Sequence, residues 1–267
     1  MGRYASSASG GRYWDRIVEM WREAPQQALW RAHSDAVNQA LFSRWLPCDR
    51  VGRLLKTDLF DEAVSDGLCP LLTAQAELVV GIDVSQLALQ VTLSCCAGLL
   101  AARADVRHLP FADDVFDVVV SISTLDHFET RDQIAAGLRE LGRVLRPGGE
   151  LLLTLDNLAN PLVALRNALP FRHLNRLGLV PYYVGATVGP RGLRRLLERA
   201  GLMLQEVEAA MHCPRVLAVA LARLLGRWTA PGIQRGFLGA LVAFERLAHW
   251  PTRYVTGYFV AARATKR

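Results

Sequence analysis

Short apolar runs alternate with stretches of helical periodicity through the middle of the chain. Five runs rich in Val, Leu and Ile predict β-strands, over residues 51–57, 76–83, 101–105, 115–121 and 150–155. Between them, helical spacing of the apolar residues predicts helices near 61–69, 85–98 and 130–145. Strands and helices that alternate at these lengths form βαβ units, and runs such as ELVVGI and FDVVVSI are apolar on both strand faces. The pattern therefore predicts a mostly parallel, doubly wound α/β sheet.

The two ends of the chain depart from this alternation. Residues 1–11 are rich in Gly and Ser and predict a flexible tail, whereas apolar residues recur at helical spacing over 12–47. Four of the six tryptophans fall in that second segment, which predicts a helical cap that either packs as core or covers a site. After residue 160 the pattern predicts a helix, a strand, two apolar helices and a last strand, over 191–200, 203–210, 214–227, 232–248 and 254–263. One large domain with appended helices fits a chain of 267 residues.

Charge is divided unequally along the chain. Residues 1–160 hold 15 Lys/Arg and 21 Asp/Glu, net −6, whereas residues 161–267 hold 16 Lys/Arg and four Glu, net +12. Seven arginines cluster in the basic part: Arg166, Arg172, Arg176, Arg191, Arg194, Arg195 and Arg199. With the apolar helices that follow, they predict either a solvated basic face or a surface for an acidic acceptor or an anionic membrane. No nucleic-acid partner is expected, because the arginines are not interleaved with aromatic residues.

The cysteines predict neither a disulfide framework nor a metal site. Their number is odd and no C-x-x-C spacing occurs among Cys48, Cys69, Cys95, Cys96 and Cys213. Reduced thiols in a cytoplasmic protein are therefore expected. The first residues lack the apolar core of a signal peptide, and no uncharged run is apolar enough to cross a membrane.

Three blocks at predicted strand ends carry candidate chemistry, since ligands of open parallel sheets bind at the carboxyl ends of the strands. In VVGIDVS, the carboxylate of Asp83 can accept both hydroxyls of a ribose. In ADVRHLPFADDVFDVVVS, Asp105 ends a strand and a stiff apolar turn follows, an arrangement that can hold an adenine ring. In RVLRPGGELLL, a Pro-Gly-Gly turn joins a helix to a strand.

In this order and spacing, from Val80 to about Leu155, the blocks resemble class I S-adenosylmethionine-dependent methyltransferases, particularly the branch of ubiquinone and menaquinone biosynthesis. The resemblance implies S-adenosylmethionine as cofactor and a Rossmann-like seven-strand sheet whose last strand is antiparallel. It implies a methyltransferase domain over 48–267 with a helical insertion at about 214–249. The implied reaction is methyl transfer to an oxygen or nitrogen of a small-molecule acceptor: a sugar, a lipid-linked intermediate or a natural product.

The resemblance also assigns residues to the cofactor. Asp83 would bind the ribose, with Val84 beside it, and Asp105 the adenine amine. Two apolar residues would pack near the base and two would end the strand beneath the methyl donor: Val106 and Leu109, then Ser121 and Ile122.

The first loop departs from the family pattern. After the first strand such enzymes carry a G-x-G-x-G loop, whereas this chain reads RLLKTDLFDEAVSDG. Glycines there allow positive φ and close approach of the backbone to a ligand. Without them, Lys56 can hold the carboxylate of the cofactor and Asp58 or Glu62 its ammonium. The alternative is a degenerate pocket.

Candidate groups for the reaction lie just beyond the same strands. His127 in TLDHF is the expected base, and Asp126 can replace or orient it. Expected acceptor contacts are Asp156, Asn157, Tyr182 and Tyr183, each of which can instead serve packing.

Two other functions remain open from the sequence. One is a non-catalytic protein of the same fold that binds a partner or a membrane, which the altered first loop favours. The other is a nicotinamide-dependent oxidoreductase, which the missing G-x-G-x-x-G disfavours. The acceptor and the oligomeric state are not predicted.

Overall fold

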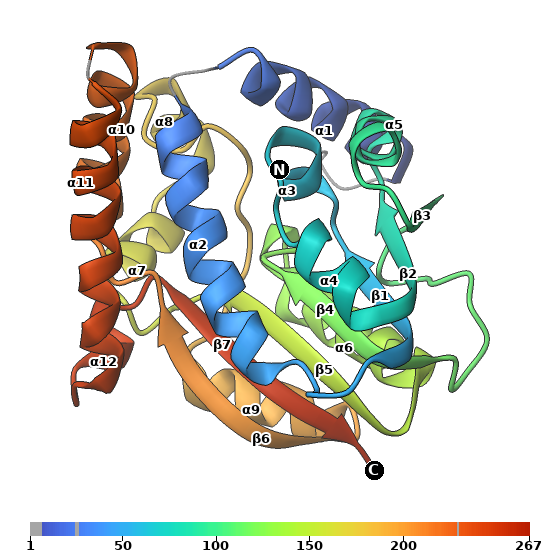
Figure 1. The fold of residues 1–267 in the computed structure, drawn as a ribbon. Helices are drawn as coiled ribbons and strands as arrows, with labels where there is room; N and C mark the ends of the chain where they lie inside the picture. Colours follow the sequence, from blue (N-terminus) through green and yellow to red (C-terminus); the bar gives the residue numbers. More distant parts are fainter. Residues whose placement is uncertain (1–6, 25–26, 229) are drawn as a thin grey trace.

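The computed structural model describes residues 7–24, 27–228 and 230–267 and contains one seven-stranded sheet (Figure 1). Its order is β3-β2-β1-β4-β5-β7-β6, and β7 runs antiparallel to both β5 and β6 while the remaining pairs are parallel. The strands are β1 Val51–Thr57, β2 Ala76–Asp83, β3 Leu99–Arg103, β4 Phe116–Ile122, β5 Leu145–Asp156, β6 Leu202–Ala210 and β7 Phe259–Lys266. The predicted Rossmann-like, mostly parallel sheet with an antiparallel last strand is confirmed.

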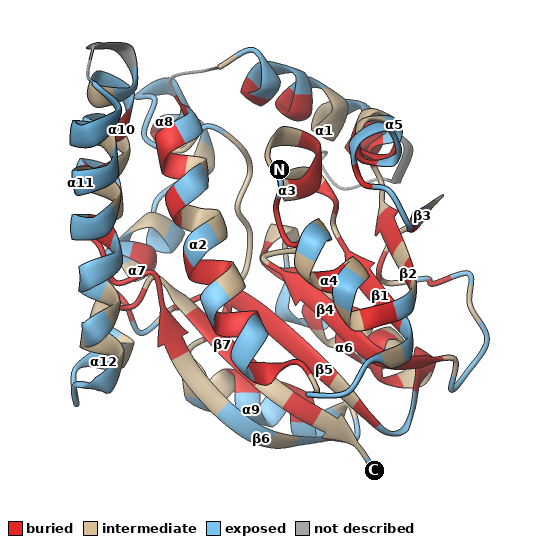
Figure 2. Cartoon of the chain, in the orientation of Figure 1, coloured by how far each residue is buried: buried red, intermediate tan, exposed pale blue. Residues whose placement is uncertain are grey.

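Helices cover both faces of the sheet, which explains why every residue of β4 is buried (Figure 2). The main helices are α1 Ser7–Arg22, α2 Ala28–Trp45, α3 Phe60–Val64, α4 Cys69–Gln75, α5 Gln86–Cys95, α6 Arg131–Val144, α7 Pro161–Ala168, α8 Phe171–Arg176, α9 Pro190–Arg199, α10 Arg215–Trp228 and α11 Pro231–Ala243. Short turns of helix complete the described chain: η2 Leu125–His127, η3 Phe244–His249 and α12 Arg253–Thr256. One hydrophobic cluster joins β-sheet residues to α1–α5, α10 and α11, and a second joins the opposite face to α6 and α9.

Several predicted boundaries differ from the structure. The bounds of β1 and β2 match, but β3 ends at Arg103, so Asp105 lies beyond the strand, in a turn with His108, and does not close it. Strand β5 starts at Leu145, so the Pro-Gly-Gly turn lies within it. The last strand starts only at Phe259, because α12 and the turn after it occupy the first residues predicted as strand.

The N-terminal helix begins inside the predicted tail. Helix α1 starts at Ser7, whereas residues 1–6 lie outside the described residues. It crosses α3 and α5, and Gly11 approaches the residue after β2 so closely that a Cβ there would lie 2.7 Å from the carbonyl oxygen of Val84. The second helix, α2, lies along α10 and α11.

The expectation of reduced thiols is wrong for one pair of cysteines. Cys69 and Cys96 form a disulfide, with their Cα atoms 6.1 Å apart. The two residues are 27 positions apart in sequence, and packing of α4 and α5 beside β2 brings them together. Cys48, Cys95 and Cys213 are free. Among the described residues, no helix is long and apolar enough to cross a bilayer.

Candidate functional site

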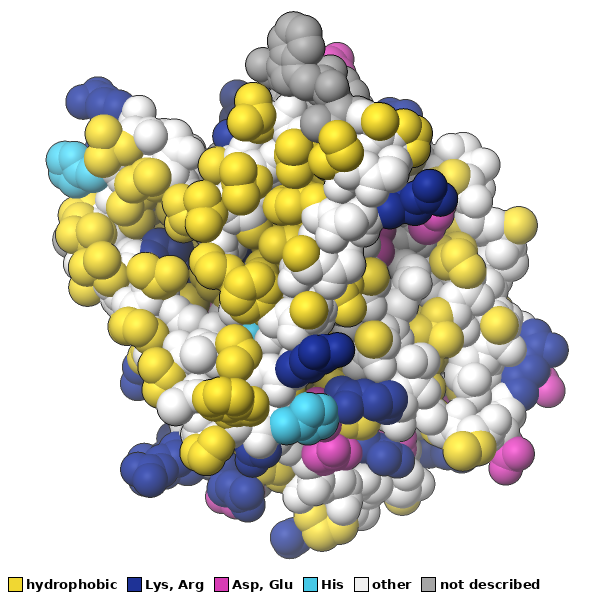
Figure 3. Space-filling model, turned by 60° about the vertical axis from the view of Figure 1, so that its left-hand side comes forward, with side chains coloured by type: hydrophobic (Ala, Val, Ile, Leu, Met, Phe, Trp, Pro, Cys, Tyr) yellow, Lys and Arg dark blue, Asp and Glu magenta, His cyan; other side chains and the backbone are white. Residues whose placement is uncertain are grey.

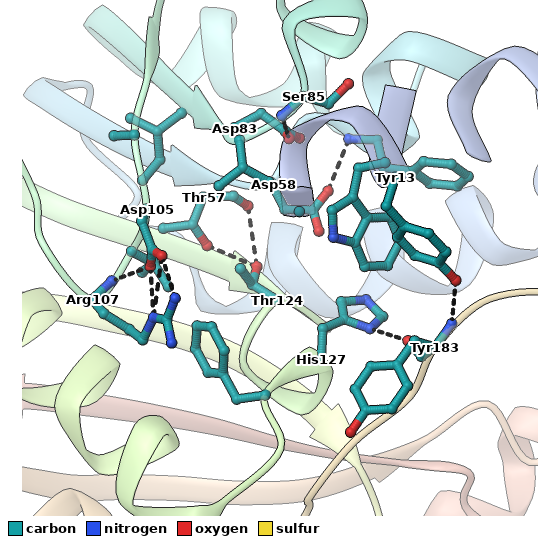
Figure 4. Close-up of a pocket in the computed structure, with 18 of the residues that line it drawn as sticks. Tyr13, Thr57, Asp58, Asp83, Ser85, Asp105, Arg107, Thr124, His127 and Tyr183 are labelled. Atoms are coloured by element: carbon teal, nitrogen blue, oxygen red, sulfur yellow. Dashed lines mark hydrogen bonds and ion pairs between the residues drawn. The ribbon is translucent and has the colours of Figure 1, made fainter. Parts of the chain in front are cut away.

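The carboxyl ends of β1, β2 and β4 meet at a cavity of about 110 Å³, here called the strand-end cavity (Figure 4). Asp58, Asp83 and Asp105 line it from the sheet, and Thr124 and His127 line it from the segment after β4. Helix α1 covers it with Tyr13 and Trp14. Three of the predicted strand-end residues are thus brought together.

Asp83 is held by backbone donors on both sides. Its Oδ2 accepts the N–H of Leu59 at 2.8 Å, and its Oδ1 accepts the N–H of Ser85 at 2.7 Å. Burial raises the pKa of Asp83 above its ordinary value. Each carboxylate oxygen can still accept a further hydrogen bond, so the group is oriented for a pair of hydroxyls. Val84, the next residue, also lines the cavity.

Asp105 and Arg107 form a fork at the opposite wall (Figure 4). The guanidinium donates from Nε to Oδ1 at 3.0 Å and from Nη2 to Oδ2 at 2.5 Å, and it lies 4.7 Å from the centre of the Phe128 ring. Burial works to raise the pKa of Asp105, but Arg107 outweighs it and the pKa is lowered, so the carboxylate stays ionised. Val106 lines the same wall. Arg107 was not predicted to contribute, although it follows Asp105 by only two residues.

The turn after β1 adopts a left-handed conformation without a glycine. Asp58 has φ 69°, in the region that Asp tolerates better than most residues because its side chain bonds locally. Here its Oδ1 accepts the N–H of Phe60 at 2.8 Å, and its own N–H donates to Ile82 O at 2.8 Å. Asp58 thus supplies the positive φ expected of the missing glycine loop, and it lines the cavity as predicted.

Lys56 and Glu62 do not reach the cavity, contrary to their predicted contacts with the cofactor. Both side chains are 1% exposed, and they form an ion pair of 3.3 Å beneath the turn. Lys56 Nζ donates to the carbonyl oxygen of Asp58 at 2.6 Å, and Glu62 Oε1 accepts the N–H of Leu68. The pair therefore braces the turn from below. The sequence could not distinguish this arrangement from a ligand contact, because the two residues flank Asp58 in either case.

A second cavity of about 90 Å³, the acidic cavity, continues from Asp58 toward α2. Asp35, Asp58, Asp61 and Arg31 line it. Burial raises the pKa of each of the three carboxyls to about 7, helped by the neighbouring carboxylates. A cation between them would relieve this repulsion. Asp35 and Arg31 were not predicted, because α2 meets this turn only in the folded chain.

His127 lies between the cavities. Its ring packs against Trp14, with centroids 4.6 Å apart and ring planes tilted by 57°, and its Nδ1 donates to the carbonyl oxygen of Tyr183 at 2.9 Å. A neutral imidazole that donates from Nδ1 carries its lone pair on Nε2. That atom lies 4.0 Å from Oδ1 of Asp126. His127 is placed to exchange a proton at Nε2.

Asp126 is buried behind His127. Its Oδ2 accepts the N–H of Asp156, while its Oδ1 has no hydrogen-bond partner among the described residues. Burial and the nearby Asp156 raise the pKa of Asp126 to about 6. An uncompensated buried carboxylate oxygen favours a donor beside it, such as a protonated His127.

A third cavity, of about 470 Å³, opens on the other side of His127 and is here called the leucine cavity. Its apolar wall includes leucines of α7 and of the segment after α8 and valines of α10. Its polar end holds Asp126, Asp156, Arg166, Tyr182 and Arg215. Arg166 donates to Asp156 at 2.7 Å, and burial raises the pKa of Tyr182 to about 12.

The remaining predicted residues occupy other places. Tyr183 lines the strand-end cavity, not the leucine cavity. Leu109 packs in the core with α6, and Ser121 lies behind Thr57, whose hydroxyl donates to it at 2.8 Å. Asn157 is fully buried and donates to the carbonyl oxygens of Tyr254 and Gly257. Leu109, Ser121 and Asn157 therefore line none of the three cavities. Ile122 lines the acidic cavity.

The sheet order and the strand-end carboxylates define the class I S-adenosylmethionine-dependent methyltransferase fold. A family model for a methyltransferase domain matches residues 63–153 of the 267, and S-adenosylmethionine is the cofactor of that class.

Curated relatives match part of this chain. Methyltransferase GfsG of Streptomyces halstedii is 45% identical over 67 residues, which are 22% of this chain and 23% of that protein. Demethylmenaquinone methyltransferase of Mycolicibacterium paratuberculosis is 38% identical over 93 residues, 29% of this chain and 39% of that protein. The matches thus span well under half of these relatives. The solved structure of the cyclase SpnF superposes with a TM-score of 0.57 at 20% identity, over 85% of this chain and 79% of that one.

Proposed function

We propose that this chain transfers a methyl group from S-adenosylmethionine to an oxygen or nitrogen of a small-molecule acceptor. The observation that carries the proposal is the position of His127, which lines the strand-end, acidic and leucine cavities together. A base at that point can meet both a cofactor on one side and an acceptor on the other.

Residues of two cavities fit two different parts of the cofactor. Asp83 and the Asp105–Arg107 fork suit a ribose and an adenine in the strand-end cavity. Asp35, Asp58 and Asp61 suit an ammonium group in the acidic cavity, and Arg31 suits a carboxylate. When bound, the cofactor supplies an activated methyl group on a sulfonium. The two cavities share Trp14, Phe60 and Asp58, so a single ligand can extend through both.

Helix α1 closes the strand-end cavity in this conformation. Its 110 Å³ is below the roughly 300 Å³ at which ligand pockets usually begin, and Trp14 lies against His127 in its wall. We propose that residues 12–47 form a cap that opens for the cofactor, and that the insertion at about 214–249 covers the acceptor.

In the reaction, His127 removes the acceptor proton at Nε2 while Nδ1 remains bonded to Tyr183 O. Asp126 then lies 4.0 Å from the charged ring and stabilises it. Asp156 and Tyr182 face the acceptor from the polar end of the leucine cavity.

The test is calorimetry with S-adenosylhomocysteine, with NADH as the comparison ligand, followed by assay of methyl transfer to phenols and amines. Binding of S-adenosylhomocysteine but not of NADH, together with formation of methylated product, supports the proposal. Absence of binding at millimolar ligand would contradict it.

A second candidate is a non-catalytic protein of the same fold. The closed strand-end cavity favours it, and the cyclase SpnF illustrates that this fold is not limited to proteins named for methyl transfer. Cofactor binding without product for any acceptor, together with binding to a partner or an anionic surface, would favour this candidate.

A further inference from the structure

Around the leucine cavity, the protein presents large apolar side chains to solvent. We call this the leucine face; it comprises Leu162, Leu165, Leu169, Leu177, Leu179, Val216, Leu217 and Leu224, each at least 45% exposed. They come from α7, the segment after α8, and α10. Figure 3 shows hydrophobic side chains gathered over the upper part of the side of the molecule that includes α10 and α11, with basic side chains along its lower edge. Contiguous exposed apolar surface of this kind marks an interaction site.

The leucine face and the leucine cavity are continuous. Leu165 and Val216, 59% and 67% exposed, also line the cavity and so form its mouth. The inner wall is formed by more buried residues, including Leu174 and Val219. An apolar chain lying in this cavity therefore has an apolar exit to the surface.

The inner end of the cavity is polar, and one hydrogen-bond acceptor there has no partner among the described residues. Asp126, only 1% exposed, keeps an Oδ1 without a hydrogen-bond partner among the described residues. A hydroxyl donor entering from the cavity would meet His127 and this carboxylate together. The cavity thus combines a polar end for a head group with an apolar passage for a tail.

Basic residues lie among the exposed leucines. Arg172 and Arg176 are exposed on α8, directly before Leu177, and Arg223 is exposed on α10 beside Leu224. Residues 161–267 carry a net charge of +12 with only four acidic side chains. This charge complements an anionic bilayer, into which the apolar side chains would insert.

We propose that the leucine cavity takes an amphiphilic acceptor, with a hydroxyl head and a long apolar chain, presented at an anionic bilayer on which the leucine face docks. The proposal rests on the proposed function, because it names the acceptor class of that reaction. The chain of the acceptor lies along α7 and α10, and its head lies at Asp126 and His127.

The first experiment compares para-nonylphenol with para-cresol as ligands, using calorimetry. The apolar chain should increase affinity by about a hundredfold or more, because each buried methylene contributes. Ala220→Trp, at an exposed position that lines the cavity, should lower the affinity for para-nonylphenol about tenfold by filling the space. Equal affinities for the two phenols would overturn the proposal.

The second experiment measures co-sedimentation with vesicles of phosphatidylcholine, alone or mixed with phosphatidylglycerol. The wild type should bind the mixed vesicles, and Leu165→Glu should weaken this binding about tenfold. Leu93→Glu is the matched control, since Leu93 is 51% exposed on α5, which lies away from α7 and α10. Lack of binding to the mixed vesicles, or equal loss in both variants, would overturn the membrane part of the proposal.

Calorimetry with S-adenosylhomocysteine on the same samples separates the two levels of inference. Cofactor binding without preference for the long-chain phenol contradicts only the proposal that the acceptor is amphiphilic. Absence of cofactor binding contradicts the proposed function itself. Circular dichroism confirms that each variant is folded.

Discussion

The two sides of His127 are built by different chemistry on one edge of the same sheet. On the strand-end side, carboxylates are held by backbone N–H groups and by Arg107, and α1 covers them. On the leucine side, aliphatic side chains surround a cavity four times larger, and many of them are exposed. In the proposed function, the first side binds the polar cofactor and the second takes the apolar part of the acceptor. This difference matches the acidic first part and basic second part of the chain.

The largest expected effect is at the boundary of the two sides. His127→Asn should lower kcat by roughly 10²–10⁴-fold, because the base is removed, while the affinity for S-adenosylhomocysteine changes little. Steady-state kinetics and calorimetry on one preparation measure both quantities. His249→Asn, at an exposed position on η3, is the control. Equal loss of kcat in the two variants would remove His127 from the chemistry.

The Cys69–Cys96 disulfide joins α4 to the residue after α5. Cys69→Ser should lower the free energy of unfolding by about 3 kcal/mol and the melting temperature by several degrees, because the unfolded chain is no longer cross-linked. Thermal unfolding measures the effect. Cys95→Ser changes a free cysteine next to Cys96 and should have little effect. A similar loss in both variants would argue against the pairing.

A smaller effect is expected at the ribose position. Asp83→Asn removes the negative charge but keeps one acceptor oxygen, so the affinity for S-adenosylhomocysteine should fall about tenfold to a hundredfold. Calorimetry measures it, with Asp49→Asn as an exposed control. Para-nonylphenol should bind this variant with the affinity it has for the wild type. An equal loss of affinity for both ligands would mean that the two sides do not act separately.

The smallest effect is a pH dependence of cofactor binding at the acidic cavity. Asp35, Asp58 and Asp61 have pKa values raised to about 7, so they gain charge as the pH rises from about 6 to about 8. An ammonium-bearing ligand prefers the charged form, so affinity for S-adenosylhomocysteine should rise severalfold over this interval, with release of protons on binding. Calorimetry in buffers of different ionisation enthalpy measures both, and a flat profile would contradict the ammonium site.

The raised pKa values of these carboxyls also affect the stability of the unliganded protein. Rising pH lowers this stability, whereas it raises the affinity for the cofactor. A carboxyl whose pKa is about 7 in the folded state and 3.8 when exposed to water in the unfolded chain binds more protons when folded. Stability contributed by these groups is therefore greatest below pH 3.8 and is lost as the pH rises from there through about 7.

Features that depend on local sequence pattern were predicted correctly. The apolar runs were sufficient for β1 and β2, whose bounds match, and the blocks around Asp83 and Asp105 indicated the cavity. The pairing of Lys56 with Glu62, the disulfide of Cys69 and the approach of α2 to Asp58 depend on packing between distant segments. No local pattern distinguishes a buried ion pair from a ligand contact, so these features required the structure.

Asp58 has a consequence for how such proteins are found. A sequence motif that requires glycine after the first strand does not match this chain. The backbone at Asp58 nevertheless adopts the left-handed conformation for which glycine is usually selected. A residue that supplies both the conformation and a carboxylate combines two functions at one position. Searches that score backbone angles instead of residue identity would retrieve chains that a glycine filter discards.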